Sequence, residues 1–213
     1  SRPQSVRFAD AVRQADGSLI AVRETHPVEG EAVNELVTVG TDGGVEVIAS
    51  GCDFYSTARL SPDGSQLAWI EWDHPNMPWD GTRLVVVDVA NPGERVVIAG
   101  GEAESIVQPE WAPDGALVFA SDRTGWWNLY RYDGGEVEPI LEMEVEFAGP
   151  AWVFGESWYG FLSEGRIATT FYDEGKSGFG VIDADGALER IELGFSDYGY
   201  HVITDGEHLV WFV

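Results

Sequence analysis

One loop gathers most of the residues that could do chemistry. Segment 71–82 contains two tryptophans, a histidine, an asparagine and two aspartates, and two prolines stiffen it. Trp79 offers an apolar surface there, while His74, Asn76 and Asp80 offer polar contacts. The composition predicts a rigid loop that binds a substrate or docks a partner domain. The alternative is that these side chains only pack on their own strands and hold the connection between them.

A second loop offers a similar set of side chains. Trp126 and Trp127 follow a Thr-Gly pair, so we expect them to be partly exposed. Arg123 precedes them and is expected to pair with a carboxylate, either Asp122 or one from a neighbouring segment. Four other tryptophans lie in or beside apolar runs, and we expect their large rings to fill the space between packed sheets. These are Trp69, Trp111, Trp152 and Trp211.

Motifs for catalysis or for a cofactor are incomplete. The serine nucleophile of an α/β-hydrolase stands in a G-x-S-x-G turn; segments 155–159 and 175–179 approach this pattern but lack its last glycine. The four histidines show no spacing typical of a metal site. Cys52 is the single cysteine, which excludes an intramolecular disulfide. The sequence therefore predicts no catalytic residue, no cofactor and no metal site in the chain.

The overall charge limits the class of partner. The chain has 213 residues, with 12 Lys+Arg against 37 Asp+Glu and a net charge of −25. Such a surface repels nucleic-acid backbones and anionic membranes, so we expect neither as a partner. No apolar run is long enough to span a bilayer, and the first ten residues lack the apolar region of a secretion signal, so we expect a cytoplasmic protein. The 44% of hydrophobic residues predicts a folded domain.

A repeat of about fifty residues organises the chain. Its marker is an acidic residue followed by glycine and then by a short apolar run. The glycines are 47, 51, 50 and 41 residues apart, at Gly17, Gly64, Gly115, Gly165 and Gly206. Glycine adopts the positive φ that a tight hairpin turn needs. The apolar runs between the turns are rich in β-branched and aromatic residues and are bounded by Gly, Pro or Asp, as strands are.

Repeated units of about four short strands predict an all-β fold of the β-propeller class. We place four complete blades at residues 6–51, 52–101, 102–147 and 148–194, and part of a fifth at 195–213. Four and a half blades indicate either a fragment of a larger propeller or a ring that closes in an unusual way. The open sheet edges of a fragment would be available for self-association.

This layout separates two faces of the propeller. The turns with an acidic residue and glycine join the first and second strand of each blade, so they share one face. The loops between the second and third strands then emerge on the opposite face, and we expect binding there. The longest of them are expected at 25–33, 71–82, 122–127 and 172–178.

Four runs in this order resemble a known family. They are 73–81, 108–115, 121–130 and 146–155. Together they are similar to the N-terminal propeller of the acylaminoacyl-peptidase and dipeptidyl-peptidase branch of the prolyl oligopeptidase family of serine peptidases. The resemblance spans essentially the whole chain. Its most specific part is the run 73–81, because Ser-Pro-Asp-Gly alone occurs in many unrelated propellers.

The resemblance implies a two-part enzyme. A C-terminal α/β-hydrolase domain, absent from this chain, would carry a Ser-Asp-His triad and be the main partner of the propeller. The propeller would cover that domain, dock it and restrict access to short peptides or aminoacyl compounds. No substrate-binding motif of the family matches this sequence residue by residue. The candidate loops are therefore equally consistent with substrate binding and with docking of the catalytic domain.

Two other functions fit the sequence. The first is a stand-alone, TolB-like propeller that binds protein partners through the long-loop face, since the hydrolase domain is missing. The second is a propeller enzyme that acts on glycans with a metal ion held by histidines from different blades. Serine hydrolase activity of the parent protein would favour the peptidase, and activity lost on chelation would favour the metal enzyme.

Overall fold

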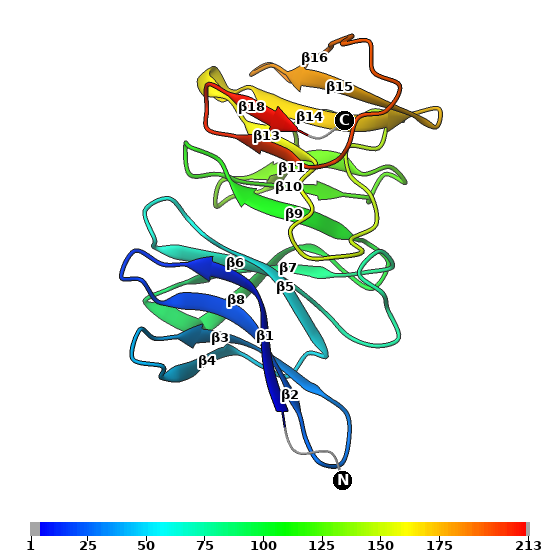
Figure 1. The fold of residues 1–213 in the computed structure, drawn as a ribbon. Coiled ribbons are helices and arrows are strands. Elements are labelled where there is room, and N and C mark those ends of the chain that lie inside the picture. Colours follow the sequence, from blue (N-terminus) through cyan, green and yellow to red (C-terminus); the bar gives the residue numbers. More distant parts are fainter. Residues whose placement is uncertain (1–4, 212–213) are drawn as a thin grey trace.

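The computed structural model describes residues 5–211 and consists of stacked β-sheets. Four sheets have four antiparallel strands each, and a fifth has two. Within each sheet the strands follow one another in chain order, so every sheet is a meander. The prediction of an all-β fold built from four-stranded repeats is therefore confirmed. Figure 1 shows the first and last sheets at opposite ends of the stack.

The first two sheets contain eight strands. Sheet 1 consists of β1 (Ser5–Arg13), β2 (Leu19–His26), β3 (Val33–Val39) and β4 (Val45–Ala49). Sheet 2 consists of β5 (Phe54–Leu60), β6 (Gln66–Trp72), β7 (Arg83–Asp88) and β8 (Asn91–Gly100). The first strands of the two sheets, β1 and β5, contact each other.

The remaining sheets complete the stack. Sheet 3 consists of β9 (Ile106–Trp111), β10 (Leu117–Ser121), β11 (Asn128–Tyr132) and β12 (Val137–Pro139). Sheet 4 consists of β13 (Tyr159–Phe161), β14 (Ile167–Asp173), β15 (Lys176–Ile182) and β16 (Leu188–Arg190). Sheet 5 is the hairpin of β17 (Val202–Thr204) and β18 (Leu209–Trp211). Residues 212–213 of the expected fifth unit lie outside the described residues.

The repeated turns have the predicted geometry. All five glycines have positive φ, between 71° and 95°. In the turn after β5, Gly64 N–H donates to the carbonyl of Ser61 at 2.8 Å, and the carboxylate of Asp63 accepts from Ser65 N–H at 3.0 Å. The acidic residue therefore stabilises the chain just ahead of it, and the glycine supplies the left-handed conformation. Each of these turns joins the first and second strand of its sheet, as expected.

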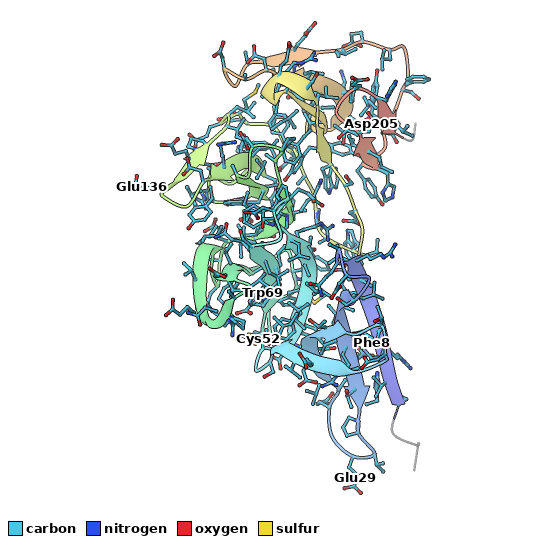
Figure 2. The ribbon with its side chains drawn as sticks, turned by 90° about the vertical axis from the view of Figure 1, so that its left-hand side faces the viewer. Phe8, Glu29, Cys52, Trp69, Glu136 and Asp205 are labelled. Atoms are coloured by element: carbon cyan, nitrogen blue, oxygen red, sulfur yellow. The ribbon has the colours of Figure 1, made fainter. Side chains whose placement is uncertain are left out.

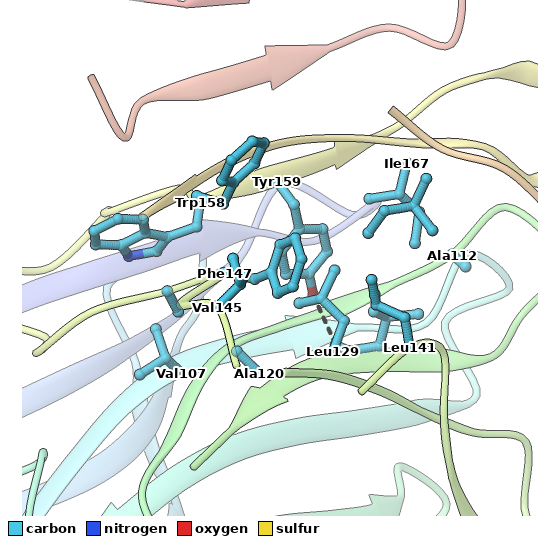
Figure 3. Packing of buried hydrophobic residues seen from close by; sticks show 14 residues of the cluster. Val107, Ala112, Ala120, Leu129, Leu141, Val145, Phe147, Trp158, Tyr159 and Ile167 are labelled. Atoms are coloured by element: carbon cyan, nitrogen blue, oxygen red, sulfur yellow. Dashed lines mark hydrogen bonds between the residues drawn. The ribbon is translucent and has the colours of Figure 1, made fainter. Parts of the chain in front are cut away.

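Apolar clusters lie between neighbouring sheets. Trp69 is fully buried between sheets 1 and 2, where Figure 2 labels it inside the stack. Phe119 and Tyr130 pack between sheets 2 and 3. Phe147 and Tyr159 fill the space between sheets 3 and 4 (Figure 3). The acidic side chains Glu29 and Glu136 are exposed and project from loops, as is usual for charged residues.

The tryptophan prediction holds for two residues and fails for a third. Trp69 is buried, and the half-buried Trp111 packs against the cluster between sheets 2 and 3. The prediction for Trp152 is wrong, because 70% of this residue is exposed. It lies in the irregular connection 140–158, and sheet 4 begins only at β13. The side chain of Trp211 lies outside the described residues.

The expected long loop at 172–178 is also wrong. Strands β14 and β15 pair as far as Asp173 and Lys176, so only Glu174 and Gly175 form the turn. Both have positive φ, 48° and 76°, as a two-residue hairpin of this kind requires. The long-loop face is thus built by the β2–β3, β6–β7 and β10–β11 loops. In the described part of the chain the only helical element is the turn Ser163–Gly165, and no helix there is long and apolar enough to cross a membrane.

Candidate functional site

A cavity of about 470 Å³ lies where sheets 2 and 3 meet. Strand β5 contributes Thr57 and Arg59 to one wall, and strand β9 contributes Gln108 to another. The β6–β7 loop, residues 73–82, and the segment 151–156 complete the lining. The lining includes a predicted site residue, Trp79, and we take this cavity as the candidate site.

Two tryptophans from distant parts of the chain meet at the cavity. The rings of Trp79 and Trp152 are 4.3 Å apart between centroids and are tilted by 42°. Trp72 and Phe154 add two more aromatic rings to the lining. Because these side chains come from strand β6, the β6–β7 loop and the 151–156 segment, the fold assembles the aromatic wall from three separate stretches of sequence.

The other predicted residues of the β6–β7 loop hold the loop in place. Asn76 Nδ2 donates to the carbonyl of Glu102 at 2.9 Å, and the Asp80 carboxylate accepts from Met77 N–H at 2.8 Å. The ring of His74 packs edge-on against Phe54, with centroids 4.8 Å apart. None of His74, Asn76 and Asp80 lines the cavity. These three side chains therefore contact the loop and its neighbours, whereas Trp79 lines the cavity.

The predicted residues of the β10–β11 loop, 122–127, are also engaged. Arg123 pairs with Glu104 at 2.8 Å, not with its neighbour Asp122, and its guanidinium lies over the Tyr130 ring at 4.4 Å. Trp127 is half-buried against the core between sheets 3 and 4. Trp126 is 36% exposed. Of this group, Trp126 is therefore the side chain most available to a partner.

Ser105 connects the two loops. Its hydroxyl donates to the carbonyl of Pro78 at 2.8 Å, and its backbone N–H donates to the carboxylate of Asp122 at 2.7 Å. Burial raises the pKa of Asp122, an effect that this N–H partly offsets. Because Ser105 is fully buried, the β6–β7 and β10–β11 loops are held side by side on one face of the stack.

Two ionisable side chains, Arg59 and Glu156, line the cavity. Arg59 Nε donates to the carboxylate of Glu110 at 2.6 Å, and Arg59 Nη1 donates to the carbonyl of Ala58 at 2.9 Å. Burial raises the pKa of Glu156, and the backbone N–H groups of Trp152 and Val153 partly offset this rise. Oε2 of Glu156 is buried without a hydrogen-bond partner, and most of the other residues that line the cavity are apolar.

The first strands of sheets 1, 2 and 3 share a feature that the sequence reading missed. Asp10, Thr57 and Gln108 are non-glycine residues with positive φ, of 51°, 56° and 49°, and each lies beside a β-bulge. They are 47 and 51 residues apart, which matches the repeat. Apart from that spacing, no sequence pattern marks them, because their side chains differ and none is glycine.

Two of these bulge residues reach the next sheet. The Asp10 carboxylate accepts from Thr57 N–H. Gln108 Oε1 accepts from Trp158 N–H at 2.5 Å, and Gln108 Nε2 donates to the carbonyl of Tyr159 at 2.8 Å. A half-buried side chain, Asp10, thus joins sheet 1 to sheet 2, and a buried one, Gln108, joins sheet 3 to sheet 4.

The sequence reading also missed segment 151–156. Its apolar residues Trp152, Val153 and Phe154 stand between Gly149-Pro150 and Gly155, a pattern that fits an exposed loop as well as a strand.

No group of three or more potential metal ligands is found among the described residues. The Cys52 thiol lies 3.3 Å from Arg83 Nη2, and burial raises its pKa.

Comparison with known proteins shows the wider context. No protein-family model and no curated protein matches the chain. Among solved structures, puromycin hydrolase matches with a TM-score of 0.88 and 35% identity, over 97% of this chain and 34% of that chain. A puromycin-hydrolyzing peptidase of Mycobacterium tuberculosis matches with the same TM-score and coverages at 32% identity. The chain thus spans about a third of the length of these proteins.

Less similar structures share the fold alone. Dipeptidyl peptidase 4 of Porphyromonas gingivalis has a TM-score of 0.68 at 13% identity, over 92% of this chain and 32% of that chain. TolB of Acinetobacter baumannii has a TM-score of 0.52 at 16% identity, over 88% and 52%. The puromycin-hydrolysing relatives, which match over nearly the whole chain, decide the assignment. The chain belongs to the prolyl oligopeptidase family of peptidases and corresponds to their β-propeller region.

Proposed function

We propose that the chain is the non-catalytic propeller of a serine peptidase, which docks a catalytic α/β-hydrolase domain and limits access to short peptides or aminoacyl compounds. The observation that carries this proposal is the 35% identity to puromycin hydrolase over 97% of the chain, within 34% of that protein's length. A chain that matches one third of a hydrolase is expected to act together with the remaining two thirds of such a protein.

The serines nearest to a nucleophile motif support a non-catalytic role. Ser157 Oγ donates to the carbonyl of Val202 at 2.6 Å, and Ser177 Oγ donates to the carboxylate of Asp197 at 2.6 Å. Ser177 lies within strand β15, and Ser157 precedes strand β13. A nucleophile elbow instead exposes its serine at a turn from a strand into a helix. Both hydroxyls therefore act as structural donors.

The face with the β6–β7 and β10–β11 loops is the proposed docking face. Met77 and Trp126 expose 47% and 36% of their surface there. Exposed apolar side chains on loops that a buried serine holds together form a preordered surface, which loses little entropy when a domain packs on it. This arrangement supports contact with the catalytic domain on that face.

The proposal is tested on the full-length source protein. We expect it to react with a fluorophosphonate probe and to hydrolyse aminoacyl para-nitroanilides and peptides of a few residues. We also expect much slower cleavage of the same sequence placed within a folded protein, because the propeller would exclude bulky substrates. A source protein that neither reacts with the probe nor hydrolyses these substrates would contradict the proposal and favour a TolB-like binding propeller.

A further inference from the structure

We propose that the cavity between sheets 2 and 3 binds a bulky aromatic side chain of a short peptide or aminoacyl compound against Trp79 and Trp152. This inference rests on the proposed function, because it names the substrate class that the propeller would select. At about 470 Å³ the cavity falls in the range of small-ligand sites, which is about 300–1,000 Å³.

The cavity lies at a junction that the positive-φ bulge residue does not span, although Arg59 pairs with Glu110 across it. Asp10 joins sheet 1 to sheet 2, and Gln108 joins sheet 3 to sheet 4. At the junction of sheets 2 and 3 the equivalent residue is Thr57, whose hydroxyl donates to Ser56 Oγ of the same strand at 3.3 Å. A short side chain at this position leaves open the space that longer polar side chains occupy at the other two junctions.

The walls favour an apolar ligand group. Two of the polar groups at the cavity already have partners, since Arg59 pairs with Glu110 and Gln108 bonds to sheet 4, whereas Oε2 of Glu156 is buried without a hydrogen-bond partner. An anionic ligand group would have to compete with Glu110 for Arg59. An apolar ring would instead displace water from Trp72, Met77 and the Trp79–Trp152 pair, and aromatic rings and thioethers interact well with such a ring.

The exposure of Trp152 favours ligand contact over a role in folding. This residue is 70% exposed, and its neighbours Val153 and Phe154 are 63% and 52% exposed. Its ring nevertheless has a defined position against Trp79. A large ring that is held in place but not buried contributes little to folding, yet it can bury further area when a ligand arrives.

Binding is tested on the source protein with N-acetyl-phenylalaninamide and N-acetyl-alaninamide as probes, by isothermal titration calorimetry. We expect tighter binding of the phenylalanine probe, and Trp152→Ala should weaken it about tenfold without changing the alanine probe. Phe195→Ala is the matched control, because Phe195 is an aromatic residue 49% exposed outside the cavity. Equal affinity for both probes, or no effect of Trp152→Ala, would overturn the inference.

Kinetics separate this inference from the proposed function. With phenylalanyl and alanyl para-nitroanilides, Trp152→Ala should raise KM about tenfold for the phenylalanyl substrate only, with kcat unchanged. Phe154→Ala should act in the same direction as a second variant at the cavity. If the protein hydrolyses both substrates but neither variant alters the ratio, the inference fails and the peptidase function stands. If it hydrolyses neither but binds the phenylalanine probe as expected, the function fails and the site stands.

Discussion

Gln108 and Tyr159 are joined by hydrogen bonds in both directions. Gln108 Nε2 donates to the carbonyl of Tyr159, and the Tyr159 hydroxyl donates to the carbonyl of Gln108, each at 2.8 Å. The two residues are 5% and 1% exposed. Along the chain, sheets 3 and 4 are joined only by the long irregular connection 140–158. The reciprocal pair of hydrogen bonds therefore helps to hold strand β13 of sheet 4 against strand β9 of sheet 3.

Removal of either side chain should therefore loosen the junction. Gln108→Ala leaves the Trp158 N–H and the Tyr159 carbonyl without their partner, and we expect a loss of about 2–4 kcal/mol in the free energy of unfolding. Tyr159→Phe should cost about 1–2 kcal/mol, because the carbonyls of Gln108 and Val118 lose one donor. Urea denaturation measures both effects.

The control for this pair is Asn34→Ala. Asn34 Nδ2 donates to the carbonyl of Asp53 at 2.7 Å, in a solvent-exposed position. Water replaces that bond, so the change should stay within about 0.5 kcal/mol. If Gln108→Ala were no more destabilising than Asn34→Ala, the buried pair would not stabilise the contact between sheets 3 and 4.

The repeat was predictable from sequence because its turns need particular residues. An acidic residue and glycine mark the hairpins after β1, β5, β9, β13 and β17. The β-branched and aromatic runs between these turns indicate the strands. The site was harder to predict because it is formed between repeats. Trp79 was recognised in its unusual loop, but its partner Trp152 is 73 positions away and lies in an apolar run that resembles a strand. The bulge at Gln108 has no local sequence signal.

Gly81 should be essential to the position of the β6–β7 loop. A Cβ atom at this position would lie 2.4 Å from the carbonyl oxygen of Glu102 and 2.5 Å from that of Gly101. Both neighbours are backbone atoms, which cannot rotate away, so Gly81→Ala should destabilise the protein by about 2–3 kcal/mol. It should also displace the loop that carries Trp79, which near-ultraviolet circular dichroism would detect through the tryptophan signal.

Gly93→Ala provides the matched control for Gly81→Ala. A Cβ atom at Gly93 meets nothing within 4 Å, and the backbone there is not left-handed. The alanine should be neutral or slightly stabilising, because it restricts the unfolded chain. Equal effects of the two substitutions would mean that close approach of the backbone at Gly81 does not constrain the loop.

Glu71 should be the costliest carboxylate to remove from sheet 2. It is 3% exposed and accepts from Trp69 Nε1 at 2.9 Å. It also pairs with Arg83 and Arg95. Glu71→Ala should lower the free energy of unfolding by about 3 kcal/mol, because it leaves an indole N–H and two arginines without their buried partner.

The net charge of the chain makes the stability of Glu71→Ala easier to interpret. Loss of one carboxylate from a protein of net charge −25 reduces repulsion and favours folding slightly. A net loss of stability in Glu71→Ala would therefore come from the lost contacts of Glu71 with Trp69, Arg83 and Arg95. Arg131→Ala is the control, because its pair with Asp114 is 39% and 59% exposed and should contribute less than about 1 kcal/mol. A stability gain in Glu71→Ala would contradict the prediction.

Asp63 should make the protein sensitive to acid. The Ser61 hydroxyl and then the backbone N–H and hydroxyl of Ser65 donate to its carboxylate, and they lower its pKa from 3.8 to about 2. The charged form is therefore favoured in the folded state, so its contribution is complete above pH 3.8 and is lost as the pH falls toward 2. Asp63→Asn cannot titrate and should flatten the dependence of unfolding free energy on pH in that interval. Ser61→Ala removes the strongest donor and should flatten it in part, whereas an unchanged slope in both variants would show that this turn does not contribute to acid sensitivity.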